Sequence, residues 1–94
     1  MPRSLTTTDA FNAIGEGRRR QILDMFGDSG ELTVHEVVSR LAIPQPSVSK
    51  HLAVLRKVGL LVVRRRGQHR VYRLNAQKLK AVHEWVKKYE QFWI

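Results

Sequence analysis

Residues 44–74 read PQPSVSKHLAVLRKVGLLVVRRRGQHRVYRL, and this stretch decides the fold of the chain. Apolar residues recur at helical spacing in its first half, whereas β-branched and alternating residues in its second half predict two strands around a turn. The stretch holds eight lysines and arginines and no acidic residue. It therefore predicts a helix followed by a β-hairpin, both positively charged.

The helix is predicted to begin near two prolines. Pro46 fits the first helical position, where its missing N–H group costs nothing. Val48, Leu52 and Leu55 share one face, and Gly59 is a typical helix stop. The other faces carry polar and basic side chains, namely Ser47, Ser49, Lys50, His51, Arg56 and Lys57.

The hairpin is predicted from two strand-like runs, LLVV at 60–63 and RVYRL at 70–74. The segment RRRGQHR at 64–70 joins them and contains Gly67, a residue that suits a tight turn. Because this turn is rich in arginine, the tip of the hairpin is expected to be strongly cationic.

The segments on either side predict further helices. Asp9 is a candidate cap for a short helix that pauses at GEG, 15–17, after which helical spacing resumes up to a turn at GDSG, 27–30. TVHE at 33–36 matches a capping box at the start of a third helix. A final helix is expected over 76–94, so the chain is predicted to be α+β and mainly α.

The composition is that of one globular domain spanning residues 1–94, with 43% hydrophobic and 27% charged residues. The net charge of +9 is segregated, because 11 of the 17 lysines and arginines lie within 40–80 and no acidic residue lies within 38–82. This segregation favours an acidic partner, either nucleic acid or an anionic membrane surface.

The chain has no cysteine, which excludes disulfides, thiolate metal sites and thiol redox sensing. Residues 1–11 lack the apolar run of a signal peptide. No apolar segment approaches the roughly 18 residues that a transmembrane helix needs. A soluble, cytoplasmic protein is therefore expected.

Two short helices joined by a tight turn and followed by an arginine-rich hairpin are typical of a winged helix-turn-helix. In this motif the second helix enters the major groove, and the hairpin, or wing, reaches adjacent phosphates or the minor groove. From the second helix we expect DNA contacts by Gln45, Ser47, Ser49, Lys50, His51 and Arg56. From the wing we expect contacts by Arg64, Arg65, Arg66, His69 and Arg70.

Five segments of the chain together resemble the ArsR family of dimeric winged-helix repressors, in that family's order and spacing. They are AFNAIGEGRRRQIL (10–23), ELTVHEVVSRL (31–41), QPSVSKHLAVLRKVGLL (45–61), RRRGQHRVYRL (64–74) and WVKKYEQFW (85–93). The third segment is the most specific. The resemblance implies a homodimer formed by the first and last helices and bound to a palindromic operator, with residues 45–51 facing the major groove.

The chain departs from the family pattern at two places. Pro44 stands where the family usually has a serine that caps the recognition helix. Glu16, Gly17 and Arg18 replace the familiar Asp-Pro-Thr. The first departure leaves the start of the recognition helix open, and the second suggests a looser junction between the first two helices.

The pattern of the last helix also fits a dimer interface. Apolar residues follow a coiled-coil-like spacing, and four of the seven aromatic residues lie in the final ten positions. A monomer of this size cannot fully cover such a stripe, so a second copy is expected to do so. The expected dimerisation residues are Phe11, Leu79, Val82, Val86, Tyr89 and Trp93.

Many ArsR-like proteins release DNA on binding a metal, but the matching residues differ here. Thr33 and His35 stand where thiolate-type sensors carry the two cysteines of Cys-Val-Cys. The last helix offers His83, Glu84 and Glu90 without the second histidine that the family's zinc sites require. The resemblance therefore implies the non-metal branch, which includes small autorepressors, with no metal or cofactor. An unidentified effector, and hence a metal- or ligand-responsive derepressor, stays open.

Other functions are matched less well. Catalysis is not expected, because Ser49 and His51 are two apart on a helix and point to different faces. Lysines at 78, 80, 87 and 88 would let the last helix lie on an anionic bilayer, although a dimer interface explains its apolar stripe better. RNA binding lacks the aromatic pair or GXXG loop of common modules. A nonspecific nucleic-acid-coating protein remains the alternative.

The residues and the resemblance thus predict a dimeric, sequence-specific transcriptional repressor that binds double-stranded DNA and not membranes. Its two half-sites are expected to lie about 10 bp apart, centre to centre, or a multiple of that spacing. Repression would follow from occlusion of the promoter.

Overall fold

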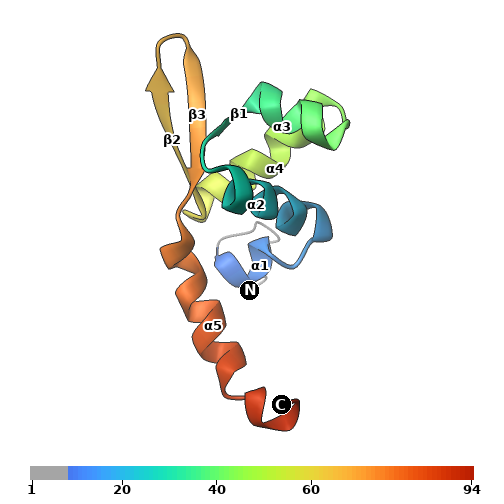
Figure 1. The fold of residues 1–94 in the computed structure, drawn as a ribbon, viewed down its shortest axis with the longest axis vertical. Helices are drawn as coiled ribbons and strands as arrows, with labels where there is room; N and C mark the ends of the chain where they lie inside the picture. Colours follow the sequence, from blue (N-terminus) through green and yellow to red (C-terminus); the bar gives the residue numbers. More distant parts are fainter. Residues whose placement is uncertain (1–8) are drawn as a thin grey trace, which may run out of the picture.

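The computed structural model describes residues 9–94, in which helices and a small sheet share one core (Figure 1). Residues 1–8 lie outside the described part of the chain. The elements in chain order are α1 (Ala10–Ala13), α2 (Gly17–Ser29), β1 (Leu32–Thr33), α3 (Val34–Leu41), α4 (Gln45–Lys57), β2 (Leu61–Arg66), β3 (His69–Leu74), η1 (Ala76–Leu79), α5 (Lys80–Lys87) and η2 (Glu90–Phe92).

The first two helices are separated where the GEG sequence predicts a pause. Asp9 caps α1 as expected, because its carboxylate accepts a hydrogen bond of 2.9 Å from the backbone N–H of Asn12. At the other end of α1, the side chain of Arg19 donates to the carbonyl of Ala13 at 2.6 Å. The side chain of an α2 arginine therefore binds a carbonyl at the C-terminal end of α1.

The expected turn at 27–30 is wrong in its position. α2 continues through Ser29, and Gly30 alone ends it, with a φ of 83°. Gly27 and Asp28 are helical because the apolar side of α2, which ends at the buried Phe26, holds this last turn against the core. A GDSG sequence is compatible with a helix end but does not fix where the end lies.

α3 and α4 form the expected pair of short helices. The capping box at the start of α3 is confirmed, since Thr33 Oγ1 accepts from the N–H of Glu36 at 3.2 Å and Glu36 Oε1 accepts from the N–H of Thr33 at 2.7 Å. α4 begins one residue earlier than predicted, with Pro44 as its N-cap and Pro46 at its second position. No side chain caps this end.

The C-terminal end of α4 is closed by the expected glycine. Gly59 has a φ of 86°. With this backbone conformation the N–H of Leu60 donates to the carbonyl of Leu55 at 2.9 Å, and the N–H of Gly59 donates to the carbonyl of Arg56 at 3.0 Å. This pair of bonds is a Schellman motif. The chain therefore turns sharply out of α4 and enters the wing without a linker.

The sheet has three strands in the order β1-β3-β2, one more than predicted. The hairpin of β2 and β3 is confirmed, with register pairs from Leu61↔Leu74 to Arg66↔His69. Gly67 opens its two-residue loop with a φ of 63°, as a type II′ turn requires. The additional strand, β1, pairs antiparallel with β3 through only two residues, which is too short for an alternating pattern to show.

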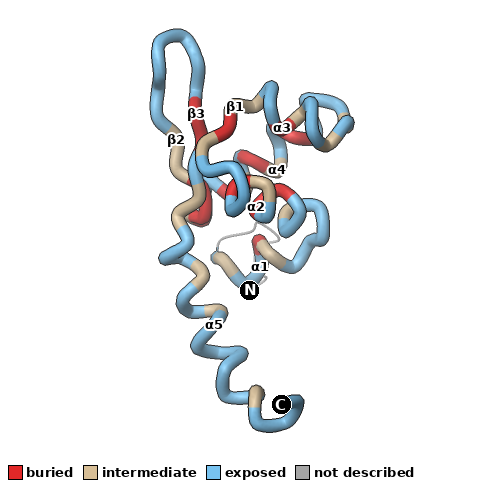
Figure 2. The backbone as a smooth tube through the Cα atoms, in the orientation of Figure 1, coloured by how far each residue is buried: buried red, intermediate tan, exposed pale blue. Residues whose placement is uncertain are grey.

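The core lies where α2, α3 and α4 meet the sheet, and Figure 2 shows buried residues concentrated there. The largest fully buried side chains come from every one of these elements and from the turn after α4. They are Phe26, Ile22, Leu32, Leu52, Leu55, Leu60, Leu61, Val37 and Val48. α5 and η2 contribute no buried residue.

The single helix expected over 76–94 is wrong. The chain forms η1, the eight-residue α5 and then η2, and it runs away from the body (Figure 1). A short helix without a fully buried residue has little to hold its last turns in α geometry. Edge-to-face packing of Phe11 on Trp85, with ring centroids 6.1 Å apart, links α1 to α5.

The capping box predicts a measurable loss of stability. Replacing Thr33 by alanine removes the acceptor for the N–H of Glu36, and we expect the free energy of unfolding to fall by about 1 kcal/mol. Urea denaturation followed by circular dichroism measures this change. Ser39→Ala, an exposed position on the same helix, is the control and should leave the midpoint nearly unchanged. Equal midpoints for the two variants would contradict the cap's contribution.

Candidate nucleic-acid interface

The polar side of α4 faces solvent because its apolar side is fixed in the core. Val48, Leu52 and Leu55 are each at most 1% exposed, and α4 packs against α2, α3 and β2. Gln45 and Lys50 are exposed as a consequence. A 13-residue helix held along one side and exposed along the other has the size and presentation that the major groove admits.

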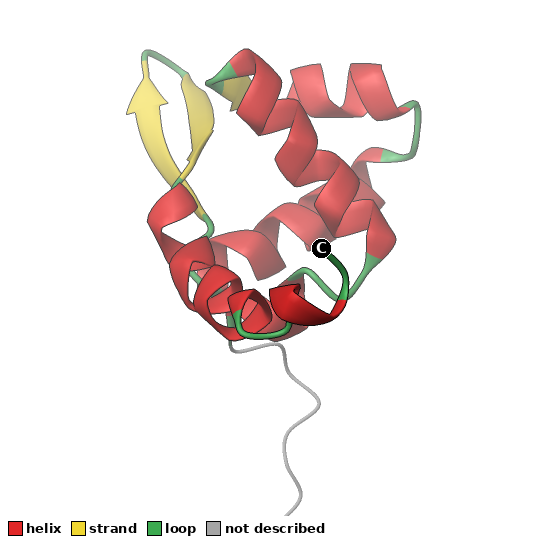
Figure 3. Ribbon diagram, turned by 60° about the horizontal axis from the view of Figure 1, so that its bottom comes forward, coloured by secondary structure: helices red, strands yellow, loops and turns green. Residues whose placement is uncertain are grey.

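The wing is held at a fixed place relative to α4. Figure 3 shows the hairpin at one edge of the helical body. Asn75, just after β3, donates from its backbone N–H to the carbonyl of Leu60 at 2.8 Å and from Nδ2 to the carbonyl of Gly59 at 3.1 Å. Both ends of the hairpin are therefore bonded to the turn that ends α4.

A groove of about 560 Å³ lies between α4 and the wing. Its lining residues are Val34, Ser49, Ala53, Arg56, Lys57, Arg70 and Tyr72. A smaller adjoining hollow of about 210 Å³ is lined by Arg56, Val63, Arg64, Arg65 and Arg70. No carboxylate lines either space in the described part of the chain.

Three of the predicted arginines, from three elements, line the groove or its adjoining hollow, and Arg64 also borders the hollow. Arg56 comes from α4, and Arg65 and Arg70 face each other across β2 and β3 in the register. Residues paired across antiparallel strands lie on the same side of a sheet, here the side that packs on α4. We call Arg56, Arg65 and Arg70 the groove arginines.

The two other wing arginines are bound to a carboxylate. Arg64 donates from Nε to Oε2 of Glu31 at 3.1 Å and from Nη2 to Oε1 at 3.0 Å, and Arg66 Nη2 donates to the same Oε1. The hydrogen bond from Arg64 is the main cause that lowers the pKa of the Glu31 carboxyl from its ordinary value. Two of the four predicted wing arginines therefore already have a charged partner.

His51 is placed differently from the other predicted contacts. Its Nδ1 lies 3.3 Å from Oε1 of Glu16, and its side chain is only 18% exposed. The other carboxylate oxygen of Glu16, Oε2, lies 3.4 Å from Nη1 of Arg19. His51 therefore contacts the junction of α1 and α2, on the opposite edge of α4 from Ser49, which lines the groove.

The structure separates the predicted contacts into three groups and places His51 apart from them. The groove and its adjoining hollow hold Ser49 with Arg56, Arg65 and Arg70. The outer side of the wing holds Arg64, Arg66 and His69. The exposed start of α4 holds Gln45, Ser47 and Lys50, while His51 lies against Glu16.

Sequence reasoning missed two acidic residues that touch these groups, Glu16 and Glu31. Both lie outside the acid-free stretch, and Glu31 is 33 residues from Arg64. No local pattern signals such a pairing, because the short strand β1 brings Glu31 to the wing.

The described residues carry no cluster of three or more histidine, aspartate and glutamate side chains that could hold a metal ion. In the same part of the chain, no helix combines the length and apolar character needed to cross a bilayer.

The chain is similar to bacterial transcription regulators. The family model described as bacterial regulatory protein, arsR family, matches residues 16–62. The arsenic resistance transcriptional regulator ArsR2 of Pseudomonas putida is 39% identical over 80 residues, which cover 85% of this chain and 70% of ArsR2. The transcriptional repressor SdpR of Bacillus subtilis is 32% identical over 78 residues, covering 83% of this chain and 86% of SdpR.

A third relative is similar in both sequence and structure. The transcriptional activator HlyU of Vibrio cholerae is 43% identical over 74 residues, covering 79% of this chain and 68% of HlyU. The solved structure of reduced HlyU matches with a TM-score of 0.67 and 40% identity, covering 83% of this chain and 81% of that one. With its winged-helix fold and the family match over residues 16–62, the chain belongs to the ArsR family and is a DNA-binding transcription regulator.

Proposed function

We propose that this chain is a homodimeric, sequence-specific repressor that binds an inverted repeat in double-stranded DNA. The observation that carries the proposal is the groove between α4 and the wing. Arg56 and Arg70 line it, Arg65 lines the adjoining hollow, and no carboxylate of the described residues lines either space. An exposed helix beside such a groove suits a duplex, because the helix reaches base edges while the arginines reach the flanking phosphates.

We assign base contacts to the exposed start of α4 and to Ser49, which lines the groove. Gln45, Ser47, Ser49 and Lys50 are exposed there. Short serine side chains permit close approach of the helix, while the amide and ammonium groups donate to bases or phosphates. His51 is the weakest of the proposed contacts, since Glu16 already engages it.

The groove arginines are proposed to bind backbone phosphates. Arginine presents a planar fork of donors that matches phosphate oxygens, and in the described chain the lining around these three side chains is free of competing carboxylates. Arg64, Arg66 and His69 on the outer side of the wing would add contacts to the same backbone. This division gives α4 the role of specificity and the wing the role of affinity.

The dimer is proposed to form through α1, α5 and the C-terminal tail, which is η2 and the two residues after it (90–94). Phe92 is 76% exposed, Trp93 66% and Ile94 84%, and Phe11, Val86 and Tyr89 are also exposed. An apolar group of this extent on a monomer marks an interaction surface. Of the six expected interface residues, Leu79 packs against the core of its own chain and Val82 is partly buried, so the outer residues carry most of the proposed contact.

Repression is proposed to follow from occlusion of the promoter by the bound dimer. SdpR is a transcriptional repressor and HlyU a transcriptional activator, so the family resemblance alone supports either direction. We propose one domain over residues 1–94, and a domain that carries both the proposed DNA surface and the proposed dimer surface fits simple occlusion. We further propose a cytoplasmic protein that works without a metal or cofactor and without catalysis.

Selection of bound duplexes from a random DNA pool tests the function. We expect an enriched inverted repeat whose halves are about 10 bp apart or a multiple of it, bound by one dimer as sized in solution. Salt-sensitive binding to every duplex without enrichment would contradict sequence specificity and favour a nonspecific nucleic-acid-coating protein. Release of DNA on addition of a metal would favour the derepressor alternative.

The groove arginines predict a change in salt dependence. Arg65→Ala with Arg70→Ala should weaken binding to all duplexes and reduce the salt slope by about one unit for each lost phosphate contact. Fluorescence anisotropy at several salt concentrations measures the slope. Lys80→Ala with Lys87→Ala removes the same charge from exposed positions on α5 and is the control. A slope that changes equally in both variants would remove the wing from the interface.

The tail predicts a change in assembly. Phe92→Ser with Trp93→Ser should raise the dimer dissociation constant by more than about tenfold, because two large apolar groups per subunit lose their burial. Sedimentation equilibrium measures this constant, and Lys87→Ser with Gln91→Ser is the control at exposed polar positions. Loss of binding to anionic vesicles with an unchanged dimer would support the membrane alternative instead.

A further inference from the structure

We propose that Glu31 regulates the wing by occupying Arg64 and Arg66 in place of DNA phosphate. In the free protein its carboxylate holds both arginines, and a duplex gains them only by displacing Glu31. Glu31 thereby weakens binding that rests on phosphate contacts alone. The inference rests on the proposed DNA-binding function and adds an internal competitor to it.

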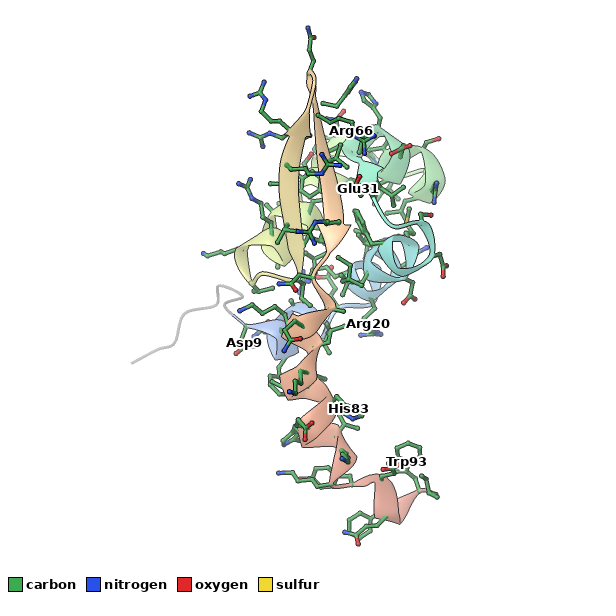
Figure 4. The ribbon with its side chains drawn as sticks, turned by 60° about the vertical axis from the view of Figure 1, so that its left-hand side comes forward. Asp9, Arg20, Glu31, Arg66, His83 and Trp93 are labelled. Atoms are coloured by element: carbon green, nitrogen blue, oxygen red, sulfur yellow. The ribbon has the colours of Figure 1, made fainter. Side chains whose placement is uncertain are left out.

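Glu31, Arg64 and Arg66 form the wing cluster, and its hydrogen bonds resemble those that arginine makes to phosphate. Arg64 binds both oxygens of the carboxylate, through Nε at 3.1 Å and Nη2 at 3.0 Å, so this edge of its guanidinium is engaged. Arg66 adds a further donor to Oε1. Figure 4 shows Glu31 and Arg66 close together beside the sheet. Because arginine binds phosphate with the same fork, the carboxylate and a phosphate compete for the same N–H groups.

The cluster divides the arginines of the wing into two sets. Arg64 and Arg66 alternate with Arg65 along β2, so their side chains leave the strand on the side opposite to Arg65 and Arg70, although Arg64 also borders the smaller hollow. Thr33 and Arg64 flank Val71 in the register, and Val71 is 4% exposed on that side. No carboxylate of the described residues lines the spaces around the groove arginines, whereas Arg64 and Arg66 are paired with Glu31 beside β1.

The cluster is open enough for DNA to disrupt it. The side chain of Arg64 is 52% exposed and that of Arg66 is 60% exposed, whereas that of Glu31 is 30% exposed. Ion pairs between exposed groups are weak, so a phosphate can replace the carboxylate. The lowered pKa of the Glu31 carboxyl keeps it charged at neutral pH, which maintains the competition under ordinary conditions.

Glu31→Gln tests the proposal, because glutamine keeps the shape of the side chain and removes its charge. We measure binding of the full chain to a random-sequence duplex by fluorescence anisotropy at 50 and 200 mM salt. The quantity compared is the affinity at 50 mM salt divided by the affinity at 200 mM salt. Relative to wild type, this ratio should grow by about twelvefold if the substitution adds two phosphate contacts, and by about 3.5-fold if it adds one. Asp28→Asn, an exposed position on α2, removes the same charge without touching the wing cluster.

Two further measurements separate competition from a general effect. In a chain carrying Arg64→Ala and Arg66→Ala, the Glu31→Gln substitution should no longer steepen the salt dependence, because the groups it releases are absent. The thermal unfolding midpoint is recorded for each variant to confirm that the chain remains folded. A steeper salt dependence that persists without both arginines would overturn the proposal.

The remaining outcomes are distinct. If wild type binds duplex but Glu31→Gln behaves like Asp28→Asn, the competition does not exist and the DNA-binding function still stands. Weaker binding and a shallower slope for Glu31→Gln would mean that Glu31 orients the arginines for DNA, which also overturns the proposal. If wild type binds no duplex at any salt concentration, the proposed function itself fails.

Discussion

The burial of one side of α4 is the constraint on which the rest of the structure depends. Val48 and Leu55 are fully buried, so the helix cannot rotate without opening the core. The same fixed rotation turns Gln45 and Lys50 to solvent and brings Ser49 to the groove. Because the Schellman turn and Asn75 bind the wing directly to the end of α4, the apolar packing also sets where the wing arginines lie.

The positive charge of the chain is arranged more finely than its total indicates. Among the described residues, no carboxylate lines the groove or the adjoining hollow, whereas the carboxylate of Glu31 lies on the outer side of the wing. A uniformly basic wing would bind any duplex, since phosphate contacts carry no sequence information. In the proposed competition, an acid that holds Arg64 and Arg66 would shift the balance toward the proposed contacts of α4 with bases.

The C-terminal part of the chain differs physically from the body. Its rings contact one another, from Trp85 to Tyr89 at 5.3 Å and from Tyr89 to Phe92 at 6.4 Å, yet they remain exposed. The fully buried core residues all lie in the body, and none lies in residues 76–94. Exposed aromatic residues gathered at one end of the chain fit the intermolecular contact proposed above, which would also set the spacing of two copies of α4.

The sequence by itself determined the capping box, the two helices of the motif, Gly59 and Gly67 at their turns, and the exposed basic residues of α4, because these depend on neighbours within a few positions. Only the tertiary structure decided the strand β1, the break in the last helix and the partners of the charged side chains. Glu31 meets Arg64 across 33 residues, and His51 meets Glu16 across two helices. Such contacts follow from how the elements pack, and local periodicity carries no information about them.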